Sequence, residues 1–383
     1  MRVAVPREVK DNEGRVALTP CGVHELVGAG HEVFVEHDAG ISSAFPDGEY
    51  TAAGATVLPT AAETWGAAEL LLKVKEPIAS EHHHLREDLV LFTYLHLAAS
   101  EPCTRALLDA GTTAIAYETV TRGASLPLLA PMSEVAGRIA PQVGAYHLMA
   151  PAGGRGMLMG GVPGAPMAEV VVIGAGVSGQ EAVAIAAGMR AHVTVLDRDV
   201  DKLRGVDETY HGAVRTIYSN THNLEEAVLG ADLVIGAVLV PGAKAPMLVS
   251  NELVSGMKPG AVLVDIAVDQ GGCFADTHPT THADPTYRVH DALFYCVANM
   301  PGAMPNTSTH ALTNATFPYV RALTQRGWRD ALRADAGLAQ GLATHAGSLT
   351  AAAVGEALRI NAEEGVVGVG SRRCRAATSG CSR

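Results

Sequence analysis

The sequence is poor in aromatic residues, and it lacks long apolar runs and runs of basic residues. Aromatic residues make up 4% of its 383 residues and hydrophobic residues 48%, so aliphatic side chains must fill its cores. No apolar run approaches the roughly 20 residues that cross a bilayer. Charged residues interrupt the apolar run at the start of the sequence after a few positions, so we do not expect this run to be a signal peptide. We therefore expect a globular, cytoplasmic protein that does not span a membrane.

The charge balance and the cysteines exclude further classes. The net charge is −12 and the pI about 5.7, which argues against a nucleic-acid partner because no basic run offsets the acidity. Cysteines stand at positions 21, 103, 273, 296, 374 and 381, without a CxxC pair or a histidine cluster at zinc spacing. Scattered, reduced thiols are the simplest interpretation, and we expect neither disulfides nor a metal site.

The most specific motif is a glycine turn between two apolar runs. Val170–Ile173 leads into Gly174-x-Gly176-x-x-Gly179, and a helix-like stretch follows. In a dinucleotide-binding fold the first glycine makes the turn, the second admits the pyrophosphate and the third lets helix and strand pack closely. Ser178 and Val177 lie in the same turn, where free N–H groups at a helix start attract a phosphate. The motif therefore predicts a nucleotide cofactor.

An acidic residue at the next strand end indicates which nucleotide. Asp197 ends the second apolar run, 18 residues beyond Gly179. There a carboxylate accepts hydrogen bonds from the ribose hydroxyls and repels a 2′-phosphate, which favours NAD over NADP. Arg198 follows directly, and an arginine in this place could instead hold a 2′-phosphate. We therefore expect a preference for NAD, and Arg198 weakens this expectation.

The order of the expected elements predicts an α/β fold with two doubly wound parallel-sheet, Rossmann-like domains. Before the glycine turn, strand candidates alternate with helical candidates; the strands are residues 2–5, 32–35, 70–74, 89–93 and 113–116. One long helix is expected over residues 132–149, with Ser133 as a cap near its start. After the turn, further strands are expected at 214–217, 233–238 and 261–266.

The glycine motif begins late, so a whole domain must precede the cofactor domain. Two helical runs are expected after the cofactor domain, at residues 309–326 and 348–361. Because two helices are too few to form a third domain, we expect them to pack on the first domain. We therefore predict a discontinuous substrate and catalytic domain of residues 1–128 plus 305–365. Residues 129–304 form the NAD-binding domain, and 366–383 form a disordered tail.

Polar residues follow several apolar strands, where ligands of parallel α/β sheets bind. They are Arg15 in the charged loop after the first strand, Lys75, His96 and Asp269. Taken singly, each has a structural alternative, such as a surface charge or a turn former. Taken together, they offer cations for a carboxylate and an acid/base pair, which an amino-acid or hydroxy-acid dehydrogenase needs.

From residue 1 to about residue 350 the chain resembles NAD-dependent alanine dehydrogenases. The resemblance rests on eight strings: 6–20, 72–77, 93–96, 131–137, 160–163, 238–246, 265–272 and 297–301. It implies the reversible oxidation of L-alanine to pyruvate and ammonium, with His96 and Asp269 as the acid/base pair. Arg15 and Lys75 would hold the substrate carboxylate and keto oxygen. A homohexamer is also implied.

The same resemblance places a set of residues around NAD, besides the glycine turn. They are Ser133, Val177, Asp197, Lys202, Ser219, Val238, Leu239, Ile266, Ala267, Val268, Asp269, Val297, Ala298, Asn299 and Met300. Two features depart from the family pattern. His278 stands where members carry an arginine that touches the cofactor, and the end of the chain differs from the family's usual ending.

Three alternatives stay open from the sequence. A saccharopine dehydrogenase-like enzyme would share the architecture but need room for a large dicarboxylate. A non-catalytic NAD(H)-binding component of a transhydrogenase would not need the pair His96 and Asp269. A sensor that binds NAD without turnover is the third. An assay with NADH, pyruvate and ammonium separates these interpretations.

Overall fold

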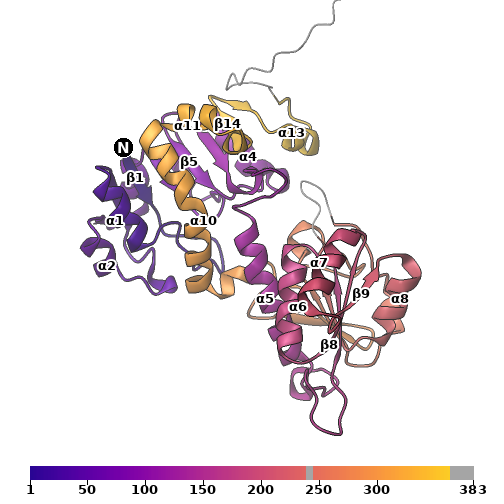
Figure 1. The fold of residues 1–383 in the computed structure, drawn as a ribbon. Coiled ribbons are helices and arrows are strands. Elements are labelled where there is room, and N and C mark those ends of the chain that lie inside the picture. The colour runs from indigo at the N-terminus through magenta and orange to yellow at the C-terminus, as the bar shows by residue number, and fades with distance from the viewer. Residues whose placement is uncertain (239–244, 363–383) are drawn as a thin grey trace, which may run out of the picture.

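The computed structural model describes residues 1–238 and 245–362, and this part of the chain forms two units, each built on a mostly parallel sheet (Figure 1). Leu239, predicted to contact the cofactor, and the predicted tail 366–383 lie outside the described residues. The predicted α/β class with two Rossmann-like units is confirmed. The predicted domain boundaries stay a prediction.

The first unit contains an eight-stranded sheet with the order β15-β14-β6-β5-β4-β1-β2-β3 in the described residues. Its strands are β1 (Arg2–Val5), β2 (Glu32–Glu36), β3 (Thr56–Leu58), β4 (Leu70–Leu72), β5 (Val90–Thr93), β6 (Thr113–Ala116), β14 (Leu342–His345) and β15 (Ser348–Leu349). Its helices are α1 (Pro20–Gly28), α2 (Asp47–Ala52), α3 (Ala61–Ala67), α4 (Glu101–Asp109), α10 (Pro305–Arg326), α11 (Trp328–Ala334), α12 (Ala336–Ala339) and α13 (Ala352–Leu358). The strands β4 and β6 are buried along their whole length, as expected for a sheet covered on both faces.

The second unit contains a seven-stranded sheet with the order β12-β13-β11-β10-β7-β8-β9 in the described residues. Its strands are β7 (Glu169–Ile173), β8 (His192–Asp197), β9 (Arg215–Tyr218), β10 (Leu233–Gly236), β11 (Val262–Asp265), β12 (Thr286–Val289) and β13 (Ala292–Tyr295). The helices are α5 (Ala130–His147), α6 (Val177–Gly188), α7 (Val200–Tyr210), α8 (Thr221–Gly230) and α9 (Asn251–Ser255).

Both sheets reverse their strand order beside their first strand. In the first unit the chain runs from β1 outward to β2 and β3, and then continues on the other side with β4, β5 and β6. In the second unit it runs from β7 to β8 and β9, and then continues with β10 and β11. At such a reversal the two flanking loops diverge and leave a crevice at the carboxyl ends of the strands. The fold therefore provides one crevice in each unit.

Two helices carry the chain between the units. Figure 1 shows α5 running from the first unit into the second, where it packs on α6. The chain returns at the start of α10, which also contacts α5. It then adds β14 to the sheet of the first unit, antiparallel to β6. The strand pairing thus makes the first unit discontinuous in sequence, as predicted.

The structure corrects three details of the predicted elements. Ser133 does not cap a helix, because α5 begins at Ala130, and Ser133 lies within its first turn. Pro131 explains the earlier start, since proline is favoured in a first helical turn. Residues 348–361 are not one helix, because Gly347 (φ +80°) turns the chain back so that β15 pairs with β14 before α13 begins. The edge strands β12 and β15, and β14 next to β15, pair antiparallel with their neighbours.

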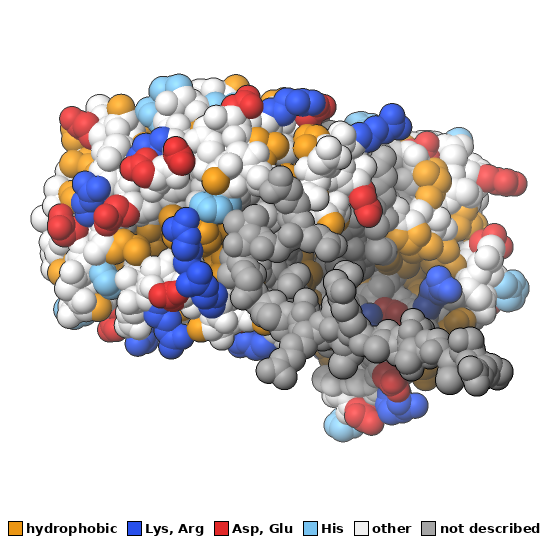
Figure 2. Space-filling view, turned by 90° about the horizontal axis from the view of Figure 1, so that it is seen from above, with side chains coloured by type: hydrophobic (Ala, Val, Ile, Leu, Met, Phe, Trp, Pro, Cys, Tyr) orange, Lys and Arg blue, Asp and Glu red, His pale blue; other side chains and the backbone are white. Residues whose placement is uncertain are grey.

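The surface and the thiols complete the outline. On the face in Figure 2, acidic, basic and apolar side chains are interspersed. Among the described residues no helix combines the length and the hydropathy needed to span a membrane. Cysteines 21, 103, 273 and 296 are free thiols.

Candidate active site

Three of the predicted site residues follow neighbouring strands of the first sheet. The loop with Arg15 follows β1, Lys75 follows β4 and His96 follows β5, and these strands lie side by side in the order β1, β4, β5. Because the strands are parallel, their carboxyl ends share one edge of the sheet. Arg15 and Lys75 therefore flank the crevice at the strand-order reversal of this unit.

Arg15 is buried and already holds a carboxylate from its own loop. Its side chain is 2% exposed, and its Nε donates to Glu13 Oε1 at 2.6 Å while one terminal nitrogen binds Glu13 Oε2. The same terminal nitrogen donates to Asn299 Oδ1 at 2.9 Å, across the boundary between the units. Burial raises the pKa of the Glu13 carboxyl, but the bonds from Arg15 outweigh burial and lower this pKa overall. The two side chains therefore form a charged pair.

The Lys75 ammonium is half-buried and forms no hydrogen bond or ion pair with any residue that the structure describes. Burial lowers its pKa, and the charge of Arg15 lowers it further, while Asp269 acts in the opposite direction. Arg15 and Asp269 therefore both lie within electrostatic range of Lys75. A cation without a protein partner in this place is equipped to bind an anionic or carbonyl oxygen.

Lys73, two residues earlier, is instead part of the core. Its ammonium binds Glu8 at 3.0 Å and Glu81 at 2.8 Å and is 1% exposed. Burial opposes its charge, but the two carboxylates outweigh burial and raise the pKa of Lys73. One ammonium cannot neutralise two buried carboxylates, which explains why burial still raises the pKa of Glu8.

His96 lies at the rim of the crevice in a strained backbone conformation. Its side chain is 43% exposed and its φ is +47°, a region that residues other than glycine seldom adopt. Glu118 accepts the His96 backbone N–H at 2.6 Å, and its carboxylate lies 3.9 Å from the ring Nδ1. The imidazole stacks on Tyr94, with 5.8 Å between ring centroids. The surrounding groups thus fix a histidine that solvent reaches.

Asp269 approaches from the second unit. It lies in the 3₁₀ helix η6 (Val268–Gln270) after β11, and it accepts the backbone N–H of Asn299 at 3.3 Å. The side chain of Asn299 in turn binds Arg15. The structure therefore connects Arg15, Asn299 and Asp269 into one chain of contacts. It shows no direct bond from His96 to these three residues among the described side chains.

The glycine turn of the second unit follows β7 at the other strand-order reversal. Gly174 has φ +103°, and a Cβ there would lie 2.7 Å from the carbonyl oxygen of Ala237. At Gly179 a Cβ would lie 1.8 Å from the carbonyl oxygen of Gly174, so only glycine fits. At Gly176, by contrast, a Cβ would meet nothing within 4 Å. The turn is tight where the chain must pack and open where a pyrophosphate would lie.

The helix after the turn offers free donors. α6 starts at Val177 with no side-chain cap, and the first backbone bond across its start is made by the N–H of Gln180 to Gly176. Among the described residues, the N–H groups of residues 177–179 have no protein acceptor. Together with the helix dipole they favour an anionic phosphate. The residues present therefore fit the phosphate portion of a dinucleotide.

Asp197 lies at the end of β8, beside the turn. Its carboxylate accepts the N–H of Ala175 at 2.6 Å and that of Asp199 at 2.8 Å, and its carbonyl accepts the N–H of Ser219 at 2.9 Å. Lys202 lies one helical turn further and pairs loosely with Asp199 at 4.0 Å. Asp197, Ser219 and Lys202 thus surround the same strand ends, which is where a ribose would lie relative to the turn.

The other positions predicted to meet the cofactor lie at three further strand ends of the second sheet. Val238 follows β10, residues 266–269 follow β11, and residues 297–300 follow β13 and enter the 3₁₀ helix η7 (Met300–Ala303). Ser133 lies in α5, which crosses between the units. His278 stacks on Tyr287 of β12 at 3.7 Å between ring centroids, so it lies beyond β11 on the same unit.

Of two cavities on the structure, one lies beside the candidate active site and the other does not. One of about 660 Å³ borders the loop of residues 8–14, Ser42, His282 and residues 302–303, and therefore touches Glu13 where the units meet. Another of about 750 Å³ lies between Arg122, Tyr319 and Gln340 and contains none of the predicted residues. Only the first adjoins the chemistry described here.

Sequence reasoning missed Glu13 and Glu118. Glu13 stands two residues before Arg15 in the same charged loop, and that spacing was the available signal. Glu118 follows β6, the strand next to β5, so it belonged to the same set of polar strand ends. Both act on predicted residues, Glu13 on Arg15 and Glu118 on His96.

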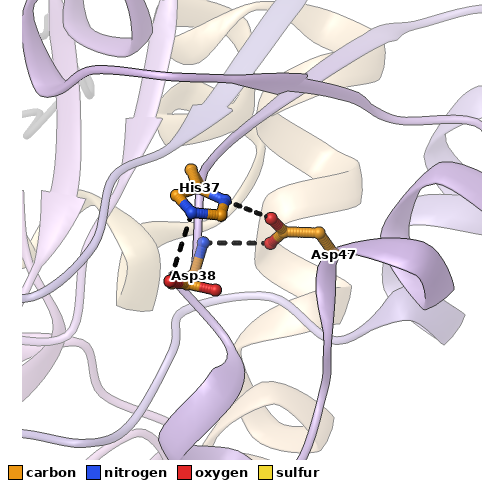
Figure 3. A group of neighbouring side chains, drawn as sticks. All are labelled: His37, Asp38 and Asp47. Atoms are coloured by element: carbon orange, nitrogen blue, oxygen red, sulfur yellow. Dashed lines mark hydrogen bonds and ion pairs between the residues drawn. The ribbon is translucent and has the colours of Figure 1, made fainter.

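A cluster of three titratable side chains, His37, Asp38 and Asp47, lies on the first unit away from the candidate active site. His37 Nδ1 binds Asp47 Oδ2 at 2.5 Å, and His37 Nε2 lies 3.3 Å from Asp38 Oδ2 (Figure 3). The hydrogen bond with Asp47 is the main reason that the pKa of His37 is raised. The two carboxylates face opposite ring nitrogens, and one imidazole gives a metal ion only one of them. Two carboxylates thus flank the His37 imidazole at the start of α2.

Comparison with known protein families gives two matches that cover most of the chain. A family model described as "Alanine dehydrogenase/PNT, N-terminal domain" matches residues 4–136. A second, described as "Alanine dehydrogenase/PNT, C-terminal domain", matches residues 140–352. The two matches follow each other within α5.

Individual proteins give the same result. The chain is 62% identical to an alanine dehydrogenase of Mycolicibacterium smegmatis, over 94% of this chain and 97% of the relative. It is 63% identical to one of Mycobacterium tuberculosis, over 91% and 94% of the two chains. A solved L-alanine dehydrogenase superposes with a TM-score of 0.91 at 48% identity, covering 94% of this chain and 99% of that one. A transhydrogenase of Sinorhizobium meliloti reaches 0.77 at 28% identity, over 91% and 98%.

Proposed function

The chain belongs to the alanine dehydrogenase/PNT family, and we propose that it is an L-alanine dehydrogenase acting with NAD. The reaction is L-alanine + NAD⁺ + water ⇌ pyruvate + ammonium + NADH + H⁺. The unpartnered Lys75 ammonium, in electrostatic range of Arg15 and Asp269 beside a strand-order reversal, is the observation that carries the proposal. It provides a binding place for a small oxoacid next to an acid/base group.

The glycine turn of the second unit would hold the cofactor, and the bound nicotinamide would supply the acceptor for the hydride from Cα of the substrate. The donors of residues 177–179 hold its pyrophosphate, and Asp197 holds a ribose. We assign the remaining cofactor contacts to Ser133, Lys202, Ser219, Val238, Leu239, residues 266–269 and residues 297–300. The strand ends that carry most of them support this assignment.

The side chains of the first unit bind the substrate. Arg15 holds its carboxylate, and Lys75 donates to the oxygen or nitrogen on the reacting carbon, where it stabilises negative charge that develops on the carbonyl. His96 takes a proton from the water that adds to the imine carbon and returns it when ammonia leaves. Asp269 accepts hydrogen bonds from the departing nitrogen. Approach of the two units would bring His96 toward the cofactor unit and exclude water.

One assay tests this function against its rivals. Purified protein is mixed with NADH, pyruvate and ammonium, and the absorbance of NADH is followed. We expect oxidation that requires both pyruvate and ammonium. Oxidation with pyruvate alone would indicate a hydroxy-acid dehydrogenase, and oxidation only with lysine and 2-oxoglutarate would indicate a saccharopine-type enzyme. The likeness to a transhydrogenase leaves hydride transfer between two nucleotides as a second candidate, and inactivity with every oxoacid would favour it.

Asp197 is expected to determine the choice of nucleotide. Replacing it with alanine removes hydrogen bonds from a charged acceptor to the ribose, so the affinity for NADH should fall about 10- to 100-fold. The affinity for NADPH should not fall, because the repulsion of its 2′-phosphate is also removed. Steady-state KM values for both nucleotides measure the change. Asp199→Ala is the matched control: Asp199 caps α7 through its side chain, and its loss should leave the NADH to NADPH ratio unchanged.

Lys75 predicts a pH dependence of substrate binding. Its pKa is lowered from the ordinary lysine value of 10.5, by burial and then by Arg15. The ammonium therefore loses its proton at a lower pH than a free lysine does, and the affinity for pyruvate should fall as the pH rises through this lowered value. Pyruvate does not titrate in that range, so its binding to the enzyme–NADH complex without ammonium measures the effect. In Lys75→Arg the alkaline decline should disappear, because a guanidinium stays charged.

We further propose a cytoplasmic location and a homohexamer. Four large apolar side chains near the end of α5 and in the loop after it support self-association: Tyr146 is 58%, Met149 48%, Leu158 63% and Val162 57% exposed. Large apolar side chains that are exposed along one stretch of chain, residues 146–162, favour a contact surface there. Sedimentation equilibrium measures the assembly, and a monomer at micromolar concentration would contradict the proposal.

A further inference from the structure

Glu13 determines which donors of Arg15 remain available to a ligand. A guanidinium has five N–H donors in a fixed plane. Glu13 takes the Nε donor and one donor of a terminal nitrogen, and Asn299 Oδ1 takes the other donor of that nitrogen at 2.9 Å. Within the described part of the chain, the second terminal nitrogen meets only the sulfur of Met132, at 2.8 Å. A thioether is a weak acceptor, so this nitrogen is the one a carboxylate can readily bind.

The ion pair between Glu13 and Arg15 is buried, unlike an ion pair on the surface. The Glu13 side chain is 0% and the Arg15 side chain 2% exposed, so the contact is screened little by solvent. Glu13 also accepts the backbone N–H of Arg15 at 3.0 Å and the side-chain amide of Asn299 at 3.1 Å. Four donors therefore converge on one carboxylate, and they fix both the plane and the rotation of the guanidinium. Two points of attachment leave Arg15 with little freedom.

We propose that Glu13 is the positioning residue of the substrate-carboxylate site: it holds Arg15 so that one terminal nitrogen binds the oxoacid carboxylate, while Lys75 donates to the oxygen on the reacting carbon. This inference rests on the proposed function. Arg15 then binds the carboxylate through one terminal nitrogen rather than through two nitrogens at once. Specificity for a short oxoacid follows, since a rigid guanidinium cannot follow a longer substrate.

The test compares Glu13→Gln with wild-type protein. Glutamine keeps the shape, but its amide presents N–H groups to the donors of Arg15, so the guanidinium must leave its place. We expect the Kd of pyruvate for the enzyme–NADH complex to rise about 10- to 100-fold, while kcat at saturating pyruvate changes much less. The Kd of NADH should rise much less than that of pyruvate, because Glu13 touches the assigned cofactor contacts only through the Asn299 amide, whereas the glycine turn lies on the other unit.

Two further variants make the result specific. Glu81→Gln neutralises another buried carboxylate of the same unit, the partner of Lys73; it should reduce stability without changing the Kd of pyruvate. Glu13→Asp keeps the charge but withdraws it by one methylene, and it should bind pyruvate better than Glu13→Gln and several-fold less well than wild type. If Glu13→Gln does not fold, wild-type affinity in Glu13→Asp overturns the proposal.

The remaining outcomes are equally decisive. Unchanged or tighter pyruvate binding in folded Glu13→Gln would show that Arg15 needs no support. Equal losses for pyruvate and NADH, or the same loss in Glu81→Gln, would show a general structural effect and also overturn the proposal. A wild-type protein that binds NADH but not pyruvate would instead contradict the proposed function, before any variant is compared.

Discussion

Replacing His96 with asparagine is expected to lower kcat by about 10²- to 10⁴-fold, the usual effect of removing a proton-transfer group. Asparagine is the better substitution than alanine because His96 has φ +47°, and asparagine tolerates this backbone region. The variant should keep the Glu118 bond to the backbone N–H of residue 96. Single-turnover oxidation of NADH with saturating pyruvate and ammonium measures the loss at the chemical step.

The chain offers a matched control for this variant. His211 is also exposed and has φ +51°, but it ends α7 in the second unit, away from the predicted acid/base pair. His211→Asn should retain wild-type turnover. A kcat for His96→Asn within about threefold of wild type would remove His96 from its catalytic role. Asp269→Asn is expected to fall in the same range, since it keeps a hydrogen-bond acceptor but not the charge.

Replacing Lys73 with methionine is expected to lower the free energy of unfolding by about 3–5 kcal/mol near pH 8, because it leaves buried charges without a partner. Glu8 and Glu81 are 2% and 7% exposed and would face each other without the ammonium. Burial raises the pKa of Glu8, and this pKa would rise further in the folded variant because the opposing charge of Lys73 is lost. The folded state would then bind protons more readily than the unfolded state, so the deficit should shrink as the pH falls through this raised value.

Urea unfolding at several pH values measures this effect. Trp65 is a suitable probe, because its ring is 1% exposed and lies 6.0 Å from Lys73 Nζ. Arg105→Ala removes an ion pair with Glu101 whose side chains are 62% and 50% exposed, and it should change stability by less than about 1 kcal/mol. A Lys73→Met loss as small as that of the control, or one that grows toward low pH, would contradict the account of the buried triad.

Much of the site was predictable because parallel strands end at a shared edge. Lys75 and His96 follow apolar runs that the sequence marks clearly as strands, and the glycine turn with Asp197 specifies the cofactor crevice by local pattern alone. The last two strands of the first sheet were less predictable. β14 and β15 are short, and they form because Ala346 and Gly347 both adopt positive φ, which a helix-like composition does not reveal.

The contacts around Arg15 could not be predicted by any local pattern. Arg15 and Asn299 lie 284 positions apart, and neither residue type indicates the other. The same limitation applied to Glu13. The sequence shows it as one of several charges in a polar loop, and only the structure shows that its side chain is buried. The choice of alanine as substrate likewise came from resemblance to whole strings and not from the chemistry of single residues.

The strand β14 joins the first sheet from the far side of the second unit in sequence. The first sheet therefore cannot be completed until late in synthesis. Thr344 of β14 bonds to Thr112, 232 positions earlier, so β6 emerges from the ribosome long before its partner exists. Until then β6 presents an unpaired edge, of the kind that invites wrong association. The second unit is complete in sequence before β14 is made and is free to fold first. We therefore expect nascent chains that stop before residue 342 to bind chaperones, and release to coincide with synthesis of β14.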